Sequence, residues 1–321
     1  MFTADQIAAR AARAVAAATA AGRDLGLTVT APLVLYDVFS VVVHLAPSPV
    51  VVRVRTVLPY TAAADPDVQA VQQRHELAVA GWLADRGHPV VAPSPLVPRE
   101  PVCRDGFSMT FWQFVEQIPD ADHFSDRRFE VTAQLHAALR GYPGELPFLG
   151  TFVPFVSDGL AQLEHRPDLL DAADLERARR EWATLEPMIC SRAAFKETFP
   201  GAGIQPIHGD APYYNVIVTA EGELWSDFEE AALGPVEFDL ASIGPDGQAA
   251  YDKAAVELGL RPLDERLLRV MESARMLQVV ACLALVPQLP MLVDGLRPSL
   301  EKWRTMAFAG GSGADSGQSS S

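Results

Sequence analysis

Two short segments in the second half of the chain restrict what it can fold into more than any other feature does. The first reads Ile207-His208-Gly209-Asp210-Ala211-Pro212-Tyr213-Tyr214-Asn215, and the second reads Trp225-Ser226-Asp227-Phe228-Glu229. Between them, residues 215–219 and 224–227 are predicted to be strands joined by a turn at residues 220–223. Polar side chains on either side of such a hairpin are held on rigid backbone, so the pattern predicts a functional site with fixed geometry.

The order and spacing of Asp210, Asn215 and Asp227 are typical of phosphoryl transfer. That reaction needs an acid that faces the attacking hydroxyl, and an amide oxygen and a second carboxylate that hold magnesium against the nucleotide phosphates. Because the acceptor proton leaves late in a loose transition state, we expect Asp210 mainly to orient the hydroxyl. The simpler interpretation is that Asp210 only caps a turn after Gly209. We expect His208 to fix the loop by a hydrogen bond rather than to carry a proton.

The first part of the chain is predicted to be a small β-sheet with two helices. Thr3 and Gln6 form a capping box that opens a helix over about residues 3–21. Strands are expected at residues 33–36, 41–45, 50–57 and 109–115. A main helix follows, with Asp65 as its N-cap and Pro66 at its first position. Its apolar stripe is expected at Val68, Val71, His75, Val79 and Trp82.

Two charged residues of this first part are candidates for a buried ion pair. Arg53 lies within the apolar strand, on the face opposite Val50, Val52 and Val54, and such a residue needs a partner or a phosphate. Glu76 lies in the middle of the predicted main helix and could be that partner. The alternative for each residue is a solvent-exposed side chain, since most Arg and Glu stay exposed.

The second part is predicted to be largely helical, which gives an α+β fold of two lobes. Helical apolar spacing covers residues 128–140, 154–165, 175–189 and 264–285. We therefore predict an N-terminal lobe at residues 1–115, a C-terminal lobe at 116–309 and a disordered Gly/Ser tail at 310–321. Asp239 lies in the apolar stretch 234–241, where a buried acid must find donors.

Charge and composition exclude several classes of protein. The net charge is −15, and residues 1–115 hold 9 basic and 9 acidic side chains, which leaves 17 and 32 for the rest. An acidic second part would attract a cationic partner, although acidic surfaces also simply favour solubility. No basic patch predicts binding to nucleic acid, and no apolar run reaches the length of a membrane span. Three distant cysteines predict no disulfide framework and favour the cytoplasm.

On these motifs the chain resembles the aminoglycoside phosphotransferase and choline kinase superfamily, small-molecule relatives of the protein kinases. The resemblance covers residues 24 to about 305, and Asp227-Phe228-Glu229 stands where protein kinases carry Asp-Phe-Gly. It implies a bilobal protein-kinase-like fold, with a small β-sheet N-lobe that holds one main helix and a mostly helical C-lobe. It also implies an ATP-dependent kinase with Mg²⁺ that acts on a hydroxylated small molecule, with GTP as the alternative nucleotide.

The resemblance also implies roles for single residues. It makes Asp210 the catalytic base, and Asn215 and Asp227 the magnesium ligands. Arg53 becomes the phosphate-binding cation, with Glu76 as its helix partner. Residues 113–115, from Gln113 to Val115, form the interlobe hinge whose backbone contacts the adenine, with Trp112 at the back of the pocket. Asp239 is expected to accept backbone N–H groups of the catalytic loop.

Two departures from the wider kinase pattern leave a second hypothesis open. The turn expected to cover the nucleotide, Asp37-Val38-Phe39-Ser40, has no glycine, so Ser40 would supply a hydroxyl or N–H instead. Arg53 stands where Lys is expected, and the two residues are not interchangeable. The alternative is therefore a nucleotide-binding pseudoenzyme of the same fold without turnover. A protein kinase is the weaker reading, because His-Arg-Asp, Asp-Phe-Gly and Ala-Pro-Glu do not occur together.

The acceptor is the least specified part. A cationic or polyhydroxylated molecule, such as an aminoglycoside-like antibiotic, an amino alcohol or a sugar, fits the acidic second lobe. Glu229 and Glu230 could face an ammonium group of such a molecule, with exposed and solvated acids as the alternative. We expect a monomer or a homodimer.

Overall fold

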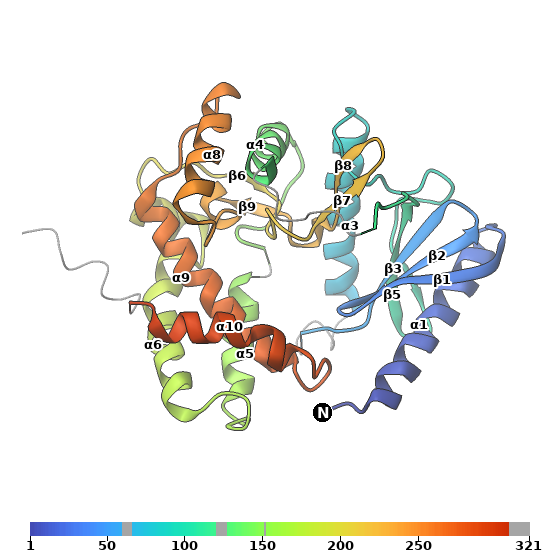
Figure 1. The fold of residues 1–321 in the computed structure, drawn as a ribbon, viewed down its shortest axis with the longest axis horizontal. Helices are drawn as coiled ribbons and strands as arrows, with labels where there is room; N and C mark the ends of the chain where they lie inside the picture. Colours follow the sequence, from blue (N-terminus) through green and yellow to red (C-terminus); the bar gives the residue numbers. More distant parts are fainter. Residues whose placement is uncertain (60–65, 120–126, 151, 308–321) are drawn as a thin grey trace, which may run out of the picture.

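The structure of the protein is a computed structural model that describes residues 1–59, 66–119, 127–150 and 152–307. The predicted N-cap Asp65 and the predicted tail at 310–321 lie outside the described residues. Figure 1 shows a sheet with two helices beside a mostly helical part, which confirms the predicted α+β fold class. The division at residue 115 stays a prediction.

Five strands form one antiparallel sheet in the order β1-β2-β3-β5-β4. Their bounds are β1 Val29–Asp37, β2 Ser40–Pro47, β3 Val50–Arg55, β4 Val102–Arg104 and β5 Phe107–Gln113. Val50, Val52 and Val54 of β3 are fully buried on one face. Arg53, between Val52 and Val54, pairs with Val42 of β2 and Thr110 of β5, and its side chain lies on the other face. The alternation read from the sequence is therefore confirmed, and it sets a charged residue on the inner face of the sheet.

Helix α1 (Ala4–Asp24) covers the apolar face of this sheet (Figure 1). Its capping box is present as predicted: the Gln6 N–H donates to Thr3 Oγ1 at 3.2 Å, and the Thr3 N–H donates to Gln6 Oε1 at 2.9 Å. Alanines let the helix approach closely, and Ala14, Ala17, Ala18 and Ala21 pack with the valines of β2 and β3 in one core cluster. This packing leaves the opposite face of the sheet free for polar contacts.

Helix α3 (Pro66–Ala84) approaches that opposite face. Val79 of the predicted apolar stripe is buried as expected, but the first two residues of the stripe are not. Val68 and Val71 are about half exposed, whereas Gln73 and Glu76 are 1% exposed. The polar residues are turned inward because they pair with the sheet: Glu76 bonds to Arg53, and Gln73 accepts from Ser108. Only the C-terminal half of the helix, with Leu77, Val79 and Leu83, is apolar inside.

The remainder of the chain is mostly helical. The helices are α4 Arg127–Leu139, α5 Phe152–Leu163, α6 Ala172–Ile189, α7 Arg192–Thr198, α8 Gly244–Glu257, α9 Glu265–Cys282 and α10 Leu292–Thr305. The four predicted helical regions match α4, α5, α6 and α9, whereas α7, α8 and α10 were not predicted. A large cluster of buried apolar residues lies among these helices, with Tyr251, Trp303 and Phe195 among its largest side chains. None of the described helices is both long and apolar enough to cross a membrane.

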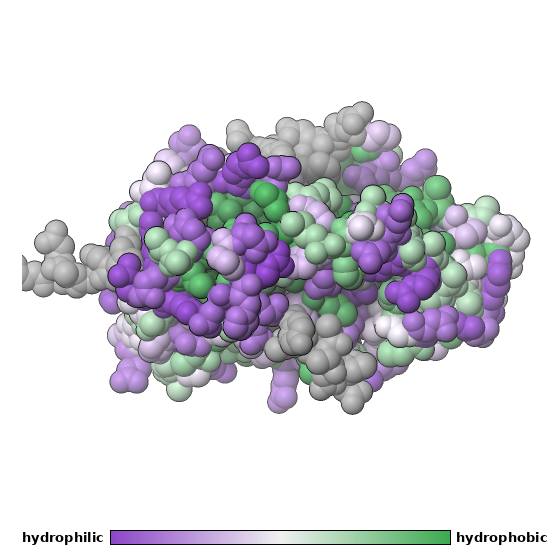
Figure 2. Space-filling view, turned by 90° about the horizontal axis from the view of Figure 1, so that it is seen from below, coloured by the Kyte–Doolittle hydropathy of each residue, from purple (hydrophilic) through white to green (hydrophobic). Residues whose placement is uncertain are grey.

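Two short ladders lie between the sheet and the helices (Figure 1). β6 (Gln205–Ile207) pairs with β9 (Ala232–Gly234), and β7 (Val216–Thr219) pairs with β8 (Gly222–Trp225) as the predicted hairpin. Trp225, at the end of β8, also bonds to the segment after α3, since its N–H donates to Pro89 O and its O accepts from the Val91 N–H. These bonds fix the second motif segment against the N-terminal part. In the view of Figure 2, hydrophilic residues gather over the helical part.

Candidate active site

The loop that follows β6 is held by one buried carboxylate. Asp239 Oδ2 accepts the His208 N–H at 2.9 Å, and Asp239 Oδ1 accepts the Gly209 N–H at 2.8 Å. His136 of α4 donates from Nε2 to Asp239 Oδ2 at 3.0 Å, and its Nδ1 meets the Tyr251 hydroxyl at 2.8 Å. Burial alone would raise the pKa of Asp239, but the bond from His136 and the nearby positive charge hold that pKa below its ordinary value. The expected backbone contacts of Asp239 are thus confirmed.

His208 ties the loop to the second motif and does not face solvent. Its Nδ1 accepts the Asp210 N–H at 3.3 Å, so Nε2 carries the proton and donates to Ser226 O at 3.0 Å. Its ring also packs against Trp225 and Phe228, with centroids 5.4 and 4.8 Å away. The expectation that His208 fixes the loop through hydrogen bonds is confirmed.

Asp210 projects from this loop with both oxygens engaged. Asn215 Nδ2 donates to Asp210 Oδ2 and to Asp210 O, each at 2.9 Å. Arg275 Nη2 of α9 donates to Asp210 Oδ1 at 3.1 Å. The Asp210 side chain is 56% exposed, so a ligand can still reach it. Because Asn215 donates to Asp210 from Nδ2, its Oδ1 is the atom that could bind a metal.

Asp227 lies next to Asn215 because Ser226 joins the two segments. The Ser226 N–H donates to Asn215 O at 2.8 Å, and the Ser226 hydroxyl donates to the same oxygen at 3.2 Å. Asp227 itself has a left-handed backbone, with φ and ψ both at 60°, at the start of a short 3₁₀ turn over Phe228–Glu230. The three polar residues singled out by their spacing are therefore brought together from both sides of the hairpin.

The electrostatics of Asp227 suit a cation. Burial raises the pKa of Asp227, Arg53 opposes this shift, and the carboxylates of Glu229 and Asp210 add to it, so that the pKa reaches about 6. A divalent cation would relieve this negative charge. Mg²⁺ takes hard oxygen ligands and commonly needs one or two carboxylates besides phosphates and waters. Asp227 and the Asn215 amide oxygen fit that donor set, although the described residues contain no group of three His, Cys, Asp or Glu placed for a metal.

Arg53 is the centre of a charge network below the sheet. Its Nη2 donates to Glu76 Oε2 at 3.0 Å and to Glu229 Oε2 at 2.8 Å, and its Nη1 donates to Asp227 Oδ1 at 2.8 Å. Burial would lower the pKa of Arg53, but these three carboxylates keep it above its ordinary value. Burial outweighs the attraction of Arg53, and the charges of Asp227 and Glu229 add to its effect, so that the pKa of Glu76 is raised to about 8. The predicted Arg53–Glu76 pair is present, and the exposed alternatives for both residues are wrong.

Glu229 and Glu230 face the sheet and α3 in this structure. Glu229 Oε2 lies 3.4 Å from Arg55 Nε, and the two arginines hold the pKa of Glu229 below its ordinary value although burial would raise it. Glu230 Oε1 accepts from Gln72 Nε2 at 3.4 Å. Both acids are half-buried, so the alternative of solvated side chains is wrong. Their predicted contact with an acceptor stays a prediction.

The remaining predicted residues lie on β2, at the end of β5 and just after β5. Ser40 is buried at the start of β2, opposite Arg55. The turn before Ser40 is tied down, since Phe39 O accepts the Val57 N–H at 3.0 Å. Gln113 ends β5 with its side chain exposed, while Val115 packs against the core that joins both parts of the molecule. A role of these residues in nucleotide binding stays a prediction.

Sequence reasoning missed Arg275, Arg55 and Gln72. Arg275 contacts Asp210 from a helix 65 positions further along the chain, which no local spacing could indicate. Arg55 lies two residues after Arg53 on the same strand face, but its contacts with Gln72 and Glu229 depend on elements distant in the sequence. Gln72 donates from Nε2 to Glu229 O at 3.0 Å and also bonds to Arg55. An inward polar stripe at Gln69, Gln73 and Glu76, next to Gln72, was the signal available in the sequence.

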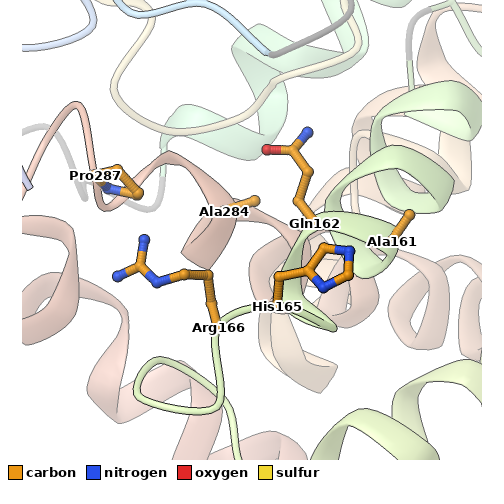
Figure 3. A pocket seen from close by; sticks show the side chains of 6 residues that line it. All are labelled: Ala161, Gln162, His165, Arg166, Ala284 and Pro287. Carbon is orange, nitrogen blue, oxygen red and sulfur yellow. The ribbon is translucent and has the colours of Figure 1, made fainter.

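A hollow of about 470 Å³ lies elsewhere, on the helical part (Figure 3). It is lined by Ala161, Gln162, His165, Arg166, Ala284 and Pro287. Arg166 is engaged by Asp168 through two bonds of 2.9 and 2.7 Å. None of the predicted site residues lines this hollow, so we assign the candidate active site by the geometry around Asp210 instead.

Comparison with known proteins agrees with this geometry. The chain matches the phosphotransferase enzyme family (APH) over residues 39–290, which is most of its length. The chain therefore belongs to the phosphotransferase enzyme family, and the predicted superfamily and enzyme class are confirmed. No curated protein matches the chain.

Several solved structures share the fold at low sequence identity. A choline kinase from Streptococcus pneumoniae is 11% identical with a TM-score of 0.62, over 90% of this chain and 99% of that chain. A putative fructosamine-3-kinase from Haemophilus somnus is 11% identical with a TM-score of 0.54, over 90% and 97%. An aminoglycoside phosphotransferase from Streptomyces rimosus, in complex with ADP and streptomycin, is 20% identical with a TM-score of 0.53, over 81% and 96%. At these identities the likeness shows the fold alone.

Proposed function

We propose that the protein is an ATP-dependent kinase that transfers the γ-phosphate to a hydroxyl group of a small molecule, with Mg²⁺ as its metal. The observation that carries this proposal is the convergence of Asp210, Asn215 and Asp227 around one bonded hairpin. An acid beside two oxygen ligands is the arrangement that phosphoryl transfer requires. The ADP bound to the Streptomyces rimosus relative supports an adenine nucleotide here.

Each residue of the site would have one task. Asp210 would orient the acceptor hydroxyl and take its proton at the carboxylate. Asn215 and Asp227 would hold magnesium, which when bound screens the charge of the phosphates. Arg53 would leave the Asp227 carboxylate and bind the nucleotide phosphates, while Glu76 keeps it in place on the sheet. Gln113 and Val115 would offer backbone groups to the base.

The acceptor is proposed to be cationic or polyhydroxylated. The excess of acidic side chains in residues 116–321 gives the helical part a negative field that attracts cations. Glu230 passes beside Gly209, the residue before Asp210, since a Cβ at Gly209 would lie 2.8 Å from Glu230 Cβ. A negative side chain beside the reacting group would suit an amino group of the acceptor. The names of the three related proteins point to acceptors of this kind: one is a choline kinase, one a putative fructosamine-3-kinase, and one an aminoglycoside phosphotransferase with bound streptomycin.

The proposal is tested with purified protein and Mg-ATP against a panel of aminoglycosides, amino alcohols, sugars and nucleosides. We expect transfer to at least one hydroxylated compound, and Asp210→Asn should slow it by about 10²- to 10⁴-fold. Asp294→Asn is the matched control, because that aspartate is 84% exposed and pairs only with Arg297 among the described side chains. The proposal would be contradicted if the wild type phosphorylated no compound of the panel and Asp210→Asn bound ligands as the wild type does.

A nucleotide-binding protein without turnover is the second candidate. The observation in its favour is that three acidic side chains, Glu76, Asp227 and Glu229, already contact Arg53, so that a nucleotide must displace at least one of them. The turn before Ser40 has no glycine and is bonded to the end of β3, which limits close approach of backbone to phosphates. Measurable magnesium-dependent ATP turnover that is lost in Asp227→Ala would rule this candidate out.

A further inference from the structure

Among the described residues, one basic side chain pairs with the proposed catalytic carboxylate, and it comes from outside the catalytic loop. The loop between Asp210 and Asn215 reads Ala-Pro-Tyr-Tyr and contains no cation. Arg275 of α9 lies with Nη2 at 3.1 Å from Asp210 Oδ1. Asn215 Nδ2 lies at 2.9 Å from the other oxygen. The carboxylate is therefore held from two separate elements.

Arg275 is itself held in place, unlike a loose surface arginine. Its Nη1 donates to Gln278 Oε1 at 2.7 Å, and its guanidinium lies 4.7 Å from the centre of the Phe238 ring. Its side chain is 19% exposed. On the same helix, Arg269 pairs with Glu265 at i,i+4 with a distance of 3.8 Å, and the two side chains are 63% and 88% exposed. The contrast shows that the position of Arg275 is specified by its surroundings.

We propose that Arg275 is a positioning residue that holds Asp210 for proton transfer and balances its charge through the reaction. This inference rests on the proposed kinase function. In the transfer step the acceptor O–H proton moves to Asp210, the acceptor oxygen forms a bond to the γ-phosphorus, and the bond from that phosphorus to the bridging oxygen of ADP breaks. Asp210 becomes neutral as the phosphate ester forms, and the Arg275 cation then faces the negative product instead.

The contact with Arg275 fixes the placement of the Asp210 side chain. With Oδ1 fixed by Arg275, one rotamer of Asp210 is favoured and Oδ2 faces Asn215, so that the acid and the metal ligands keep one relative placement. A misplacement of about 1 Å in such a site can cost about 100-fold in rate. The cation also lies near Asp239, which holds the loop backbone, and so a purely structural role of Arg275 is the competing explanation.

The experiment compares the wild type with Arg275→Gln, Arg275→Lys and Arg275→Ala, with Arg269→Ala as the control on the same helix. Magnesium-dependent ATP hydrolysis, with water as the acceptor, gives a readout without a known acceptor. We expect kcat to fall about 100-fold in Arg275→Gln, while KM for ATP, the calorimetric affinity for Mg-ATP and the melting temperature stay near those of the wild type. Arg275→Lys should keep part of the rate. Millimolar guanidinium should restore part of it in Arg275→Ala, and Arg269→Ala should behave as wild type.

Each contrary result has a defined meaning. If the wild type turns over ATP and Arg275→Gln is equally fast, the positioning role is overturned and the proposed function stands. If Arg275→Gln loses stability or nucleotide affinity along with rate, and neither Lys nor guanidinium restores the rate, Arg275 is only structural and the inference is overturned. If the wild type neither hydrolyses ATP nor transfers phosphate, the proposed function fails first and this inference fails with it.

Discussion

Gly209 is the residue on which the placement of Asp210 depends most directly. Its φ is +88°, and a Cβ at this position would lie 2.1 Å from the backbone oxygen of Glu230. The loop can therefore pass so close to the second motif only because the side chain is missing. The His-Gly-Asp order is thus explained by packing as well as by chemistry.

We predict that Gly209→Ala destabilises the protein far more than Gly26→Ala does. Gly26 has a similar φ of +85° but nothing within 4 Å of the added Cβ, so its cost is the left-handed strain of about 1–2 kcal/mol. Gly209→Ala adds a backbone clash, and we expect a loss above about 4 kcal/mol, as for other severe core changes. Urea unfolding of both variants measures the difference. Equal losses would show that the contact with Glu230 relaxes freely.

The sequence could predict some residues of the candidate site but not others. Asp210, Asn215 and Asp227 could be singled out because their spacing is local and the hairpin between them is short. Arg275 could not, because its contact with Asp210 depends on how α9 packs against the loop. The double contact of Glu229 with Arg53 and Arg55 depends in the same way on the approach of two distant elements.

At the scale of elements, α3 shows why a correct helix can carry a wrong face. The sequence predicted its existence and position, but periodicity alone favoured Val68 and Val71 as buried residues, and they are exposed. Its inner face is polar because the facing strand carries Arg53 and Arg55. The unpredicted elements have physical reasons of their own: β6 and β9 have three residues each, and α10 contains Pro298. Such elements are defined by tertiary contacts rather than by their own pattern.

The polar face of α3 leads to a prediction about pH. Burial raises the pKa of Glu76 in the folded protein from its ordinary value of 4.5 to about 8. Between these values the folded state binds more protons than the unfolded state, so the free energy of unfolding should fall as pH rises, by up to about 1.4 kcal/mol per pH unit. Asp227, with its pKa raised to about 6, adds a change of the same sign at lower pH.

Glu76→Gln should remove the Glu76 part of this dependence. Glutamine imitates the protonated acid, so the variant should resemble the wild type near pH 5 and become relatively more stable near pH 8. Glu100→Gln is the control. Glu100 is an exposed acid, and its partner Arg74 lies on α3, the helix that carries Glu76. Denaturant unfolding at several pH values gives the curves. Parallel curves for the wild type and Glu76→Gln would show that Glu76 is ionised throughout.

At the scale of the whole molecule, the proposed site lies where both parts share a core. One cluster joins Leu77, Val79 and Leu83 of α3 to Leu135 and Leu139 of α4, and it also contains Trp225 and Phe228 of the motif segments. The sequence predicted two lobes but not this joint core, since no pattern in either part specifies a partner in the other. The shared core holds Asp227 against Arg53, which comes from the sheet.

We therefore predict that the two parts unfold together and that Leu83 supports both. Leu83 is fully buried in the shared cluster, so Leu83→Ala should cost about 2–5 kcal/mol, from lost burial and from the cavity left behind. Leu96→Ala is the control, because that side chain is 52% exposed and should change stability by less than about 0.5 kcal/mol. Tryptophan fluorescence and far-UV circular dichroism should report one coincident transition in the wild type and in both variants. Two separate transitions in the wild type would show that the lobes are independent, and the proposed site would then have to be assembled by its ligands rather than by the shared core.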